Sequence, residues 1–329
     1  MHKFTATSKK PAKVLGLFAV LAMTLAASSA VAQFPTKPVR VLVPFGAGSS
    51  TDIVMRIVAQ PLGQALGQPL VVENKPGADG AIAAAEVARS APDGHTLILG
   101  TNSPFSAAPH LRRNAPYDVL ADFTAVSLVG NYTFFVLVHP SVPARTLGEL
   151  VSYARANPGK LNYATGNTSG IVMTAMLASQ VNMQLVQIPY KSEPPAITDL
   201  LSGTVQMMIS SYATVAPHLR EGKLRPLVTT LPNRSPLLPE VPSIVEAGFP
   251  KFPIASWAGV LGPAKMPREV TERLNRELNA LLRRGDVRET LLKQAFDPKG
   301  ATTEEFAAYV KEQYETWGRA IREAGIQPE

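Results

Sequence analysis

The stretch Val39–Gly63, VRVLVPFGAGSSTDIVMRIVAQPLG, predicts a buried strand that passes through a loop of small residues into a helix. Val39–Val43 is short, branched and apolar, as strands inside a sheet are. Asp52–Leu62 has apolar residues at helical spacing. The small residues of Gly46–Thr51 leave backbone N–H groups bare at the helix start, where aligned peptide dipoles favour an anion. The stretch therefore predicts an anion-binding loop, for a nucleotide phosphate or a small carboxylate. Ser49, Ser50 or Thr51 capping the helix explains the same residues without a ligand.

The alternation of strand and helix continues along the chain. Further strands are expected at Leu70–Val72, Thr96–Leu99, Ala125–Val129, Phe134–Val138, Leu161–Ala164, Gln187–Pro189, Val205–Ser210 and Ser256–Leu261. Further helices are expected at Ala81–Arg89, Leu147–Ala156, Ile171–Val181, Pro195–Leu201, Pro267–Arg284, Asp286–Gln294 and Thr303–Ala324. This alternation is typical of largely parallel α/β sheets. The proline-rich segment Pro232–Pro253 is expected to be an extended connector with a turn of helix near Ser243–Ala247. We therefore expect two α/β lobes, with the chain crossing between them more than once.

The N-terminal segment has the pattern of a secretory signal peptide. A lysine-rich lead precedes the apolar run Val14–Ala27, and Ala30-Val31-Ala32 is a small-x-small cleavage signal. A membrane anchor would need about 20 apolar residues, more than this run supplies. We expect cleavage after Ala32 and export to the periplasm.

Composition excludes several classes of protein. The formal net charge of +7 includes the lysines of the signal peptide, so the exported chain is only mildly basic. Lys and Arg are scattered rather than striped, which argues against nucleic acid as a partner. The absence of cysteine excludes disulfides, a thiol nucleophile and thiolate metal sites. The histidines of the exported chain lie far apart, without metal-ligand spacing. No metal and no cofactor is expected.

Two further polar stretches follow predicted strands. Tyr163–Gly170, YATGNTSG, is a second loop of small residues between a strand and a helix, and it offers neutral donors to an anion. Together with Gly46–Thr51 it would form a clamp, one loop per lobe, for a ligand with an anionic group. Thr101-Asn102-Ser103 follows another strand, where α/β sheets place ligands. An ordinary turn is an equal explanation for that last stretch.

Enzymatic interpretations find less support. Gly46-x-Gly48, with Glu73 after the next strand, imitates a dinucleotide fingerprint. Thr51, however, stands where the third glycine would allow close helix packing, and an exported protein has no maintained nicotinamide pool. GNTSG differs from the GxSxG nucleophile elbow by one residue. Asp52 is expected to complete the helix start rather than to act as a base. No residue is assigned a catalytic role, and an exported nucleotide-binding enzyme using the GAGSST loop stays as the alternative.

The chain resembles the Bug-type periplasmic receptors, the substrate-binding components of tripartite tricarboxylate transporters, over essentially all of its exported length. The segments that carry the resemblance are PTKPVRVLVPFGAGSSTD (Pro35–Asp52), VVENKPGADG (Val71–Gly80), APDGHTLILG (Ala91–Gly100), KLNYATGNTSG (Lys160–Gly170), VQIPYKS (Val186–Ser192), RSPLLPEVPSIVEAGFP (Arg234–Pro250) and EEFAAYVKEQYETW (Glu304–Trp317).

The resemblance implies a non-catalytic clamshell receptor that delivers a small carboxylate to a membrane permease. It implies a periplasmic-binding-protein fold of two α/β lobes, each a mostly parallel sheet flanked by helices, with a monomer as the default state. We expect lobe 1 to comprise residues 33–128 and 254–329 and lobe 2 to comprise residues 129–253. The ligand-binding residues expected from the loops and the resemblance are Phe45, Gly48, Ser49, Thr51, Asp52, Asn102, Ser103, Thr165, Gly166, Asn167, Thr168, Ser169 and Ser210.

Four residues depart from the family's usual pattern. Ser49 replaces the second glycine of a pair, and Ser192 replaces the glycine of Tyr-Lys-Gly. Ser210 and Ser211 replace an Asp-Asn pair after a strand. Because this removes an acid that would bind an amine or hydroxyl, we expect a plain dicarboxylate or an aromatic acid rather than an amino acid.

Overall fold

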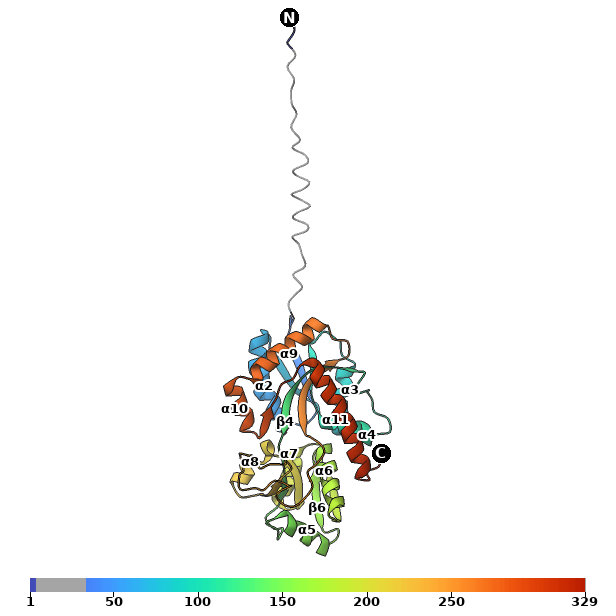
Figure 1. Ribbon diagram of the computed structural model, residues 1–329, viewed down its shortest axis with the longest axis vertical. Helices are drawn as coiled ribbons and strands as arrows, with labels where there is room; N and C mark the ends of the chain where they lie inside the picture. Colours follow the sequence, from blue (N-terminus) through green and yellow to red (C-terminus); the bar gives the residue numbers. More distant parts are fainter. Residues whose placement is uncertain (4–33, 329) are drawn as a thin grey trace.

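A computed structural model describes residues 1–3 and 34–328, which form two β-sheets flanked by helices (Figure 1). The predicted signal peptide, residues 1–32, lies outside the described residues apart from its first three. Within residues 1–3 and 34–328, no helix is both long and apolar enough to span a membrane.

The first sheet contains the strand from which the prediction started. Its strand order is β11-β4-β10-β3-β1-β2. The strands are β1 (Val39–Val43), β2 (Leu70–Asn74), β3 (Thr96–Thr101), β4 (Phe123–Tyr132), β10 (Trp257–Pro263) and β11 (Phe296–Pro298). β1 pairs in parallel with β2 and β3, whereas β10 lies antiparallel between β3 and β4, and β11 is antiparallel to β4. The sheet is therefore mixed, because the chain returns through β10 and β11 after forming the second sheet.

The second sheet has the order β7-β6-β8-β5-β9. Its strands are β5 (Phe134–Val138), β6 (Leu161–Thr165), β7 (Leu185–Pro189), β8 (Met207–Ser211) and β9 (Arg225–Thr229). β6 is parallel to β7 and β8, and β5 is antiparallel to both β8 and β9. The expected α/β fold is confirmed, with β5, β10 and β11 as antiparallel members of otherwise parallel sheets.

The helices cover both faces of each sheet. The first sheet is flanked by α2 (Ser50–Leu66), α3 (Ala81–Ala88), α9 (Arg268–Leu282), α10 (Gly285–Leu292) and α11 (Thr303–Glu323). The second is flanked by α5 (Leu147–Ala156), α6 (Thr168–Gln180), α7 (Glu193–Ser202) and α8 (Tyr212–Arg220). Short helical segments occupy Ala78–Gly80, Ser103–Ala107 and α4 (Ala108–Leu111). The end of α11 extends towards the second lobe and contacts α6, a helix that flanks the second sheet (Figure 1).

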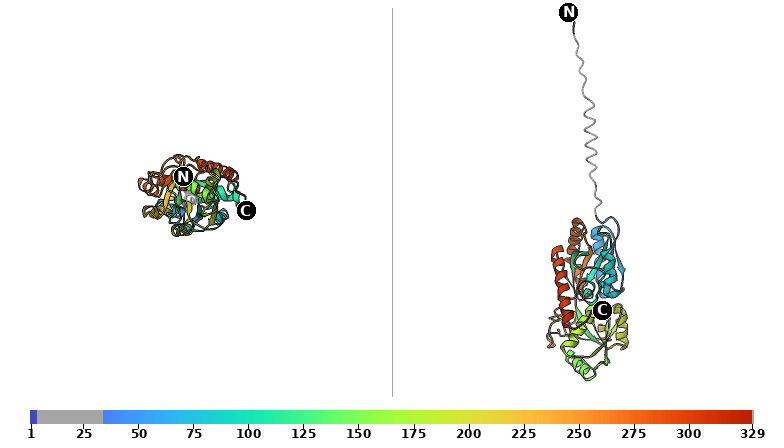
Figure 2. Two further views of the ribbon diagram at one scale, coloured as in Figure 1. Left: turned by 90° about the horizontal axis from the view of Figure 1, so that it is seen from below. Right: turned by 90° about the vertical axis from the view of Figure 1, so that its right-hand side faces the viewer.

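The chain crosses between the sheets at two places. β4 ends at Tyr132 and β5 begins at Phe134, so only Thr133 separates the first sheet from the second. The return runs from the end of β9 to the start of β10, through the proline-rich segment, which has a hydrogen-bonded turn at Ser243–Ala247. The predicted lobe boundary at residues 128/129 falls inside β4, because this strand continues beyond Val129. We propose that the lobes meet at these two crossings, and Figure 2 shows the two sheets one above the other from a second side.

Candidate functional site

A small cavity lies between the two sheets, at the ends of strands β1, β3 and β6. Its volume is about 20 Å³, room for about one water molecule. It is lined by Phe45, Ser49, Ser50, Thr51, Thr101, Asn102, Ser103, Tyr132, Phe134, Gly166, Asn167, Ser169 and Glu193. Residues from both predicted loops therefore share one cavity, and a small organic ligand would need the lobes to part before it could enter.

The first loop forms the N-terminus of α2. Ser49 is the N-cap, and its hydroxyl accepts a hydrogen bond from the Asp52 N–H at 3.3 Å. Gly48 has a φ of 77°, a left-handed conformation in which glycine is unstrained. Ser49, Ser50 and Thr51 are all buried and line the cavity. The helix cap therefore lies within the loop that was predicted to bind an anion, because Ser49 both caps α2 and lines the cavity.

Asp52 stabilises the first loop through hydrogen bonds and does not line the cavity. Its carboxylate accepts hydrogen bonds from the Gly48 N–H at 2.9 Å, from Arg56 Nε at 2.9 Å and from Asn74 Nδ2 at 2.9 Å. Asn74 Nδ2 also donates to the Phe45 carbonyl at 3.1 Å. Burial alone would raise the pKa of Asp52, but the bonds from Arg56, Gly48 and Asn74 outweigh it and hold the pKa below its ordinary value. Asp52 is therefore a structural anion that shapes the loop.

Asp52→Asn is expected to lower the free energy of unfolding at neutral pH by about 1–3 kcal/mol, because it weakens hydrogen bonds to a charged group. Because the folded-state pKa lies below the ordinary value of 3.8, this stabilisation is full above pH 3.8 and is lost as the pH falls through the folded-state pKa. Urea unfolding at a series of pH values should show the difference between wild type and variant shrinking only at acid pH. A difference that grows towards acid pH would contradict this role.

The second loop forms the N-terminus of α6 in the other lobe. Asn167 is the N-cap and accepts a hydrogen bond from the Gly170 N–H at 2.9 Å. Ser169, in the first turn, accepts a hydrogen bond across the lobes from Asn102 Nδ2, and Asn102 Oδ1 accepts one from the Trp257 N–H at 3.3 Å. The N-termini of α2 and α6 therefore approach one cavity from opposite lobes, and both dipoles favour a negative charge there.

One wall of the cavity is aromatic. Phe45, Tyr132 and Phe134 line it and are all buried. The Tyr132 hydroxyl donates to Thr51 Oγ1 at 3.4 Å, which connects the end of β4 to the first loop. This wall can cover the carbon skeleton of a ligand whose charged group lies on the helix N-termini.

Glu193, the first residue of α7, is a lining residue that the sequence interpretation missed. It is 2% exposed. One oxygen, Oε1, accepts from Ser210 Oγ at 3.0 Å, Asn167 Nδ2 at 3.3 Å and the Ser211 N–H at 3.5 Å. The other, Oε2, accepts from Ser50 Oγ at 3.2 Å, Ser211 Oγ at 3.4 Å and Thr214 Oγ1 at 3.4 Å. Burial raises the pKa of Glu193, and the bonds from Ser210, Ser211 and Ser50 oppose that rise. Its carboxylate thus joins loops of both lobes.

The structure gathers most of the predicted binding residues. Those that line the cavity are Phe45, Ser49, Thr51, Asn102, Ser103, Gly166, Asn167 and Ser169. Gly48, Asp52, Thr165, Thr168 and Ser210 do not line the cavity. Thr165 Oγ1 accepts from Gln187 Nε2 at 3.2 Å, so its hydroxyl serves the β6–β7 pair. The Ser210 hydroxyl donates to Glu193. An acid therefore lies at the end of β8, where the sequence suggested only neutral serines.

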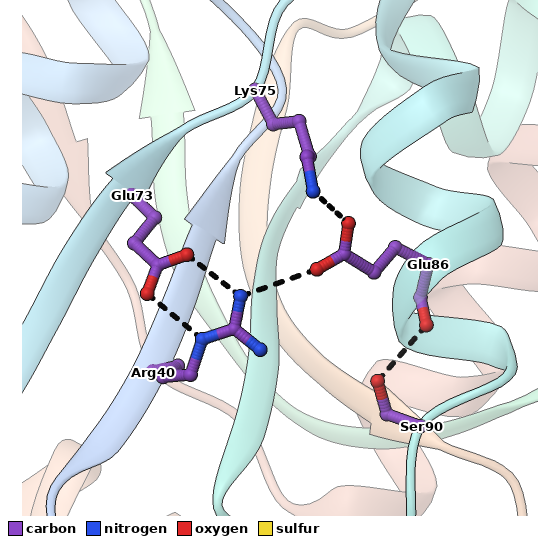
Figure 3. A network of polar contacts seen from close by, with 5 residues as sticks. All are labelled: Arg40, Glu73, Lys75, Glu86 and Ser90. Atoms are coloured by element: carbon purple, nitrogen blue, oxygen red, sulfur yellow. Dashed lines mark hydrogen bonds and ion pairs between the residues drawn. The ribbon is translucent and has the colours of Figure 1, made fainter.

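Glu73, whose position in the sequence resembles that of a ribose-binding acid, forms an ion pair with Arg40 outside the cavity. Arg40 Nε and Nη2 bind its two carboxylate oxygens at 2.8 and 2.7 Å, and Arg40 also binds Glu86, which in turn accepts from Lys75 (Figure 3). The Arg40 hydrogen bonds lower the pKa of Glu73. This network ties β1 to β2 and α3, so Glu73 is a structural residue of the sheet. Among the described residues, no group of three or more His, Asp and Glu side chains could hold a metal ion.

Two α/β lobes around a buried polar cavity define a solute-binding receptor of the periplasmic clamshell type. Residues 54–326 match the family described as "Tripartite tricarboxylate transporter family receptor". The chain is 33% identical to protein BugT of Bordetella pertussis over 95% of this chain and 97% of that protein. The structure of Rpa4515 from R. palustris with adipate aligns with a TM-score of 0.87 at 32% identity, covering 90% of this chain and 100% of that one. MatC from Rhodopseudomonas palustris with bound malate aligns with a TM-score of 0.83 at 31% identity, covering 88% and 100%.

The chain belongs to the tripartite tricarboxylate transporter receptor family. Members of this family are solute-binding receptors and not enzymes, so the nucleotide-binding enzyme considered from the GAGSST loop is excluded. The Bug-type resemblance is confirmed.

Proposed function

We propose that this protein is a periplasmic receptor that binds one carboxylate of a small ligand between its lobes and delivers the ligand to a tripartite tricarboxylate-type membrane permease. The observation that carries the proposal is the meeting of the α2 and α6 N-termini at one buried cavity. Hydrogen bonds to an ionised carboxylate are each worth about 1.5–3 kcal/mol, so neutral donors suffice. The export signal and the family support the periplasmic location.

Binding would couple to closure of the two lobes. A ligand on the first loop gains the donors of the second loop only when the lobes approach, and this differential contact favours the closed form. The direct bond between Asn102 and Ser169 shows that side chains of the two lobes can meet across the cavity. The crossings at Thr133 and at residues 230–256 are the places where a hinge would act.

The sequence favours a dicarboxylate or an aromatic acid as the ligand. The adipate and malate in the two related structures support a dicarboxylate, and the aromatic wall of Phe45, Tyr132 and Phe134 supports an aromatic acid. The buried Glu193 carboxylate opposes a second negative charge in the same cavity.

The double variant Thr168→Ala/Ser169→Ala is expected to weaken ligand binding by roughly tenfold or more without unfolding the protein, because each lost hydrogen bond to a charged ligand costs over 1 kcal/mol. Ser169 lines the cavity, and the buried Thr168 hydroxyl beside it makes no hydrogen bond with the described residues. Isothermal titration calorimetry with the best ligand of a carboxylate panel measures the effect.

Thr174→Ala is the matched control, because Thr174 is equally buried on α6 and its hydroxyl makes no hydrogen bond with the part of the chain that the structure describes, but it does not line the cavity. This variant should bind like wild type. If the double variant also keeps its full affinity, the second loop is only a helix cap.

A further inference from the structure

Glu193 is the only charged residue among the described residues that line the cavity. Its six hydrogen-bond partners in the structure are five neutral side-chain groups and one backbone N–H. Such donors orient and solvate a carboxylate, but they bring no compensating positive charge. A ligand that enters this cavity therefore meets helix N-termini and neutral donors at the two loops, and a buried carboxylate at the start of α7.

In its ionised form, which the hydrogen bonds from Ser210, Ser211 and Ser50 favour against the effect of burial, Glu193 acts on whatever ligand group lies beside it. Two carboxylates a few ångströms apart in a buried site repel each other strongly, because little solvent screens them. An ammonium group in the same place is attracted, and the Ser50 hydroxyl, which lines the cavity beside Glu193, offers it a neutral acceptor. Tyr132 and Phe134 line the same cavity, and aromatic faces attract a cation.

We infer that Glu193 is a specificity-determining residue that selects ligands carrying a protonated amine together with the carboxylate, that is, zwitterionic amino acids in place of plain dicarboxylates. The inference rests on the proposed function, because it assumes that the cavity binds a carboxylate. It changes the ligand class expected from Ser210 and Ser211, since the hydroxyls of both donate to an acid supplied by α7.

The test compares ligands that differ in one end group. Isothermal titration calorimetry of the full exported chain at neutral pH would pair succinate, glutarate and adipate with 4-aminobutanoate, 5-aminopentanoate and 6-aminohexanoate. Straight-chain monocarboxylates would be paired with the corresponding α-amino acids. In at least one pair the amine-bearing ligand should bind roughly 10- to 100-fold more tightly than its partner. A hydrogen bond to a charged group changes the affinity by about this factor.

Glu193→Gln removes the charge with little change of shape. It should reduce the affinity for the amine-bearing ligand by a similar factor and leave that for the dicarboxylate unchanged or improved. Glu269→Gln is the matched control, because Glu269 lies in the first turn of α9 but is exposed and outside the cavity. It should keep the wild-type preference.

Two results overturn different claims. If a dicarboxylate binds wild type more tightly than every amine-bearing partner, the inference about Glu193 fails and the receptor function stands. If no carboxylate of any kind binds, the proposed function itself fails. Should Glu193→Gln not fold, the ligand pairs measured on wild type decide the question alone.

Discussion

Replacing Gly166 by alanine is expected to weaken ligand binding about 100-fold or more while leaving most of the fold in place. A Cβ atom at Gly166 would lie 2.5 Å from the Glu193 backbone nitrogen and 2.7 Å from the Ser192 carbonyl carbon. Contacts this short require something to move, and the opposing atoms are backbone rather than a flexible side chain. The second loop and the start of α7 must therefore separate, and both contribute residues to the cavity.

The Gly166→Ala effect should be about 100-fold or more in affinity, equivalent to about 3 kcal/mol, with an overpacking cost of about 1–3 kcal/mol in stability. Calorimetric titration and denaturant unfolding measure the two quantities separately. Gly148→Ala is the control in the same lobe, because a Cβ there meets only Thr146 Oγ1 at 3.9 Å. Alanine at that helical position should be neutral or stabilising. Wild-type affinity in Gly166→Ala would contradict the close approach of loop and helix.

Trp257→Ala is expected to cause the largest loss of stability, about 3–5 kcal/mol, which is typical of deleting a buried aromatic side chain. Trp257 is 0% exposed in β10. Its ring packs edge-on against Phe306 of α11 at a centroid distance of 5.7 Å and against Tyr309 at 6.0 Å. Its backbone N–H donates to Asn102 Oδ1 at 3.3 Å, and alanine keeps this donor, so the cavity should be disturbed only as far as β10 shifts.

Trp257→Phe should recover a large part of this stability. The Trp257 indole nitrogen makes no hydrogen bond with the described residues, so phenylalanine loses packing volume but no polar contact. Urea unfolding of both variants decides the matter. If the two variants are equally destabilised, the packing of the ring against α11 is not what stabilises β10.

Much of the fold could be predicted from local pattern. β1, β5 and α5 have the predicted bounds, because branched apolar runs mark Val39–Val43 and Phe134–Val138. For α5, Thr146 and Glu149 form a capping box that fixes the start. The longer elements missing from the prediction are α8 and β9, and the short strand β11, α4 and the short helical segments Ala78–Gly80 and Ser103–Ala107 were missed as well. α8 contains Pro217, β9 begins Arg-Pro, and β11 has three residues. Their stability comes from pairing and packing against β5, β8 and β4, which short sequence windows do not reveal.

The candidate site, like the fold, could be predicted from the sequence only in part. Both loops could be predicted because a strand, small residues and a helix cap follow one another in the chain. Glu193 could not, because its role depends on residues that are distant in sequence, such as Ser50 and Ser210, meeting around it. The predicted helix also began at Pro195, whereas α7 begins at Glu193. The one available signal was Ser192, which replaces the family's usual glycine directly before Glu193.

The central claim is that this protein is a carboxylate receptor, and ligand-induced stabilisation tests it most directly. The chain from Gln33 to Glu329 would be melted with dicarboxylates, tricarboxylates, benzoates, amino acids and NAD, and each hit titrated by calorimetry. The account predicts that at least one carboxylate-bearing ligand raises the melting temperature and binds at one site per chain, whereas NAD has no effect. Stabilisation by NAD, with no response to any carboxylate, would contradict it.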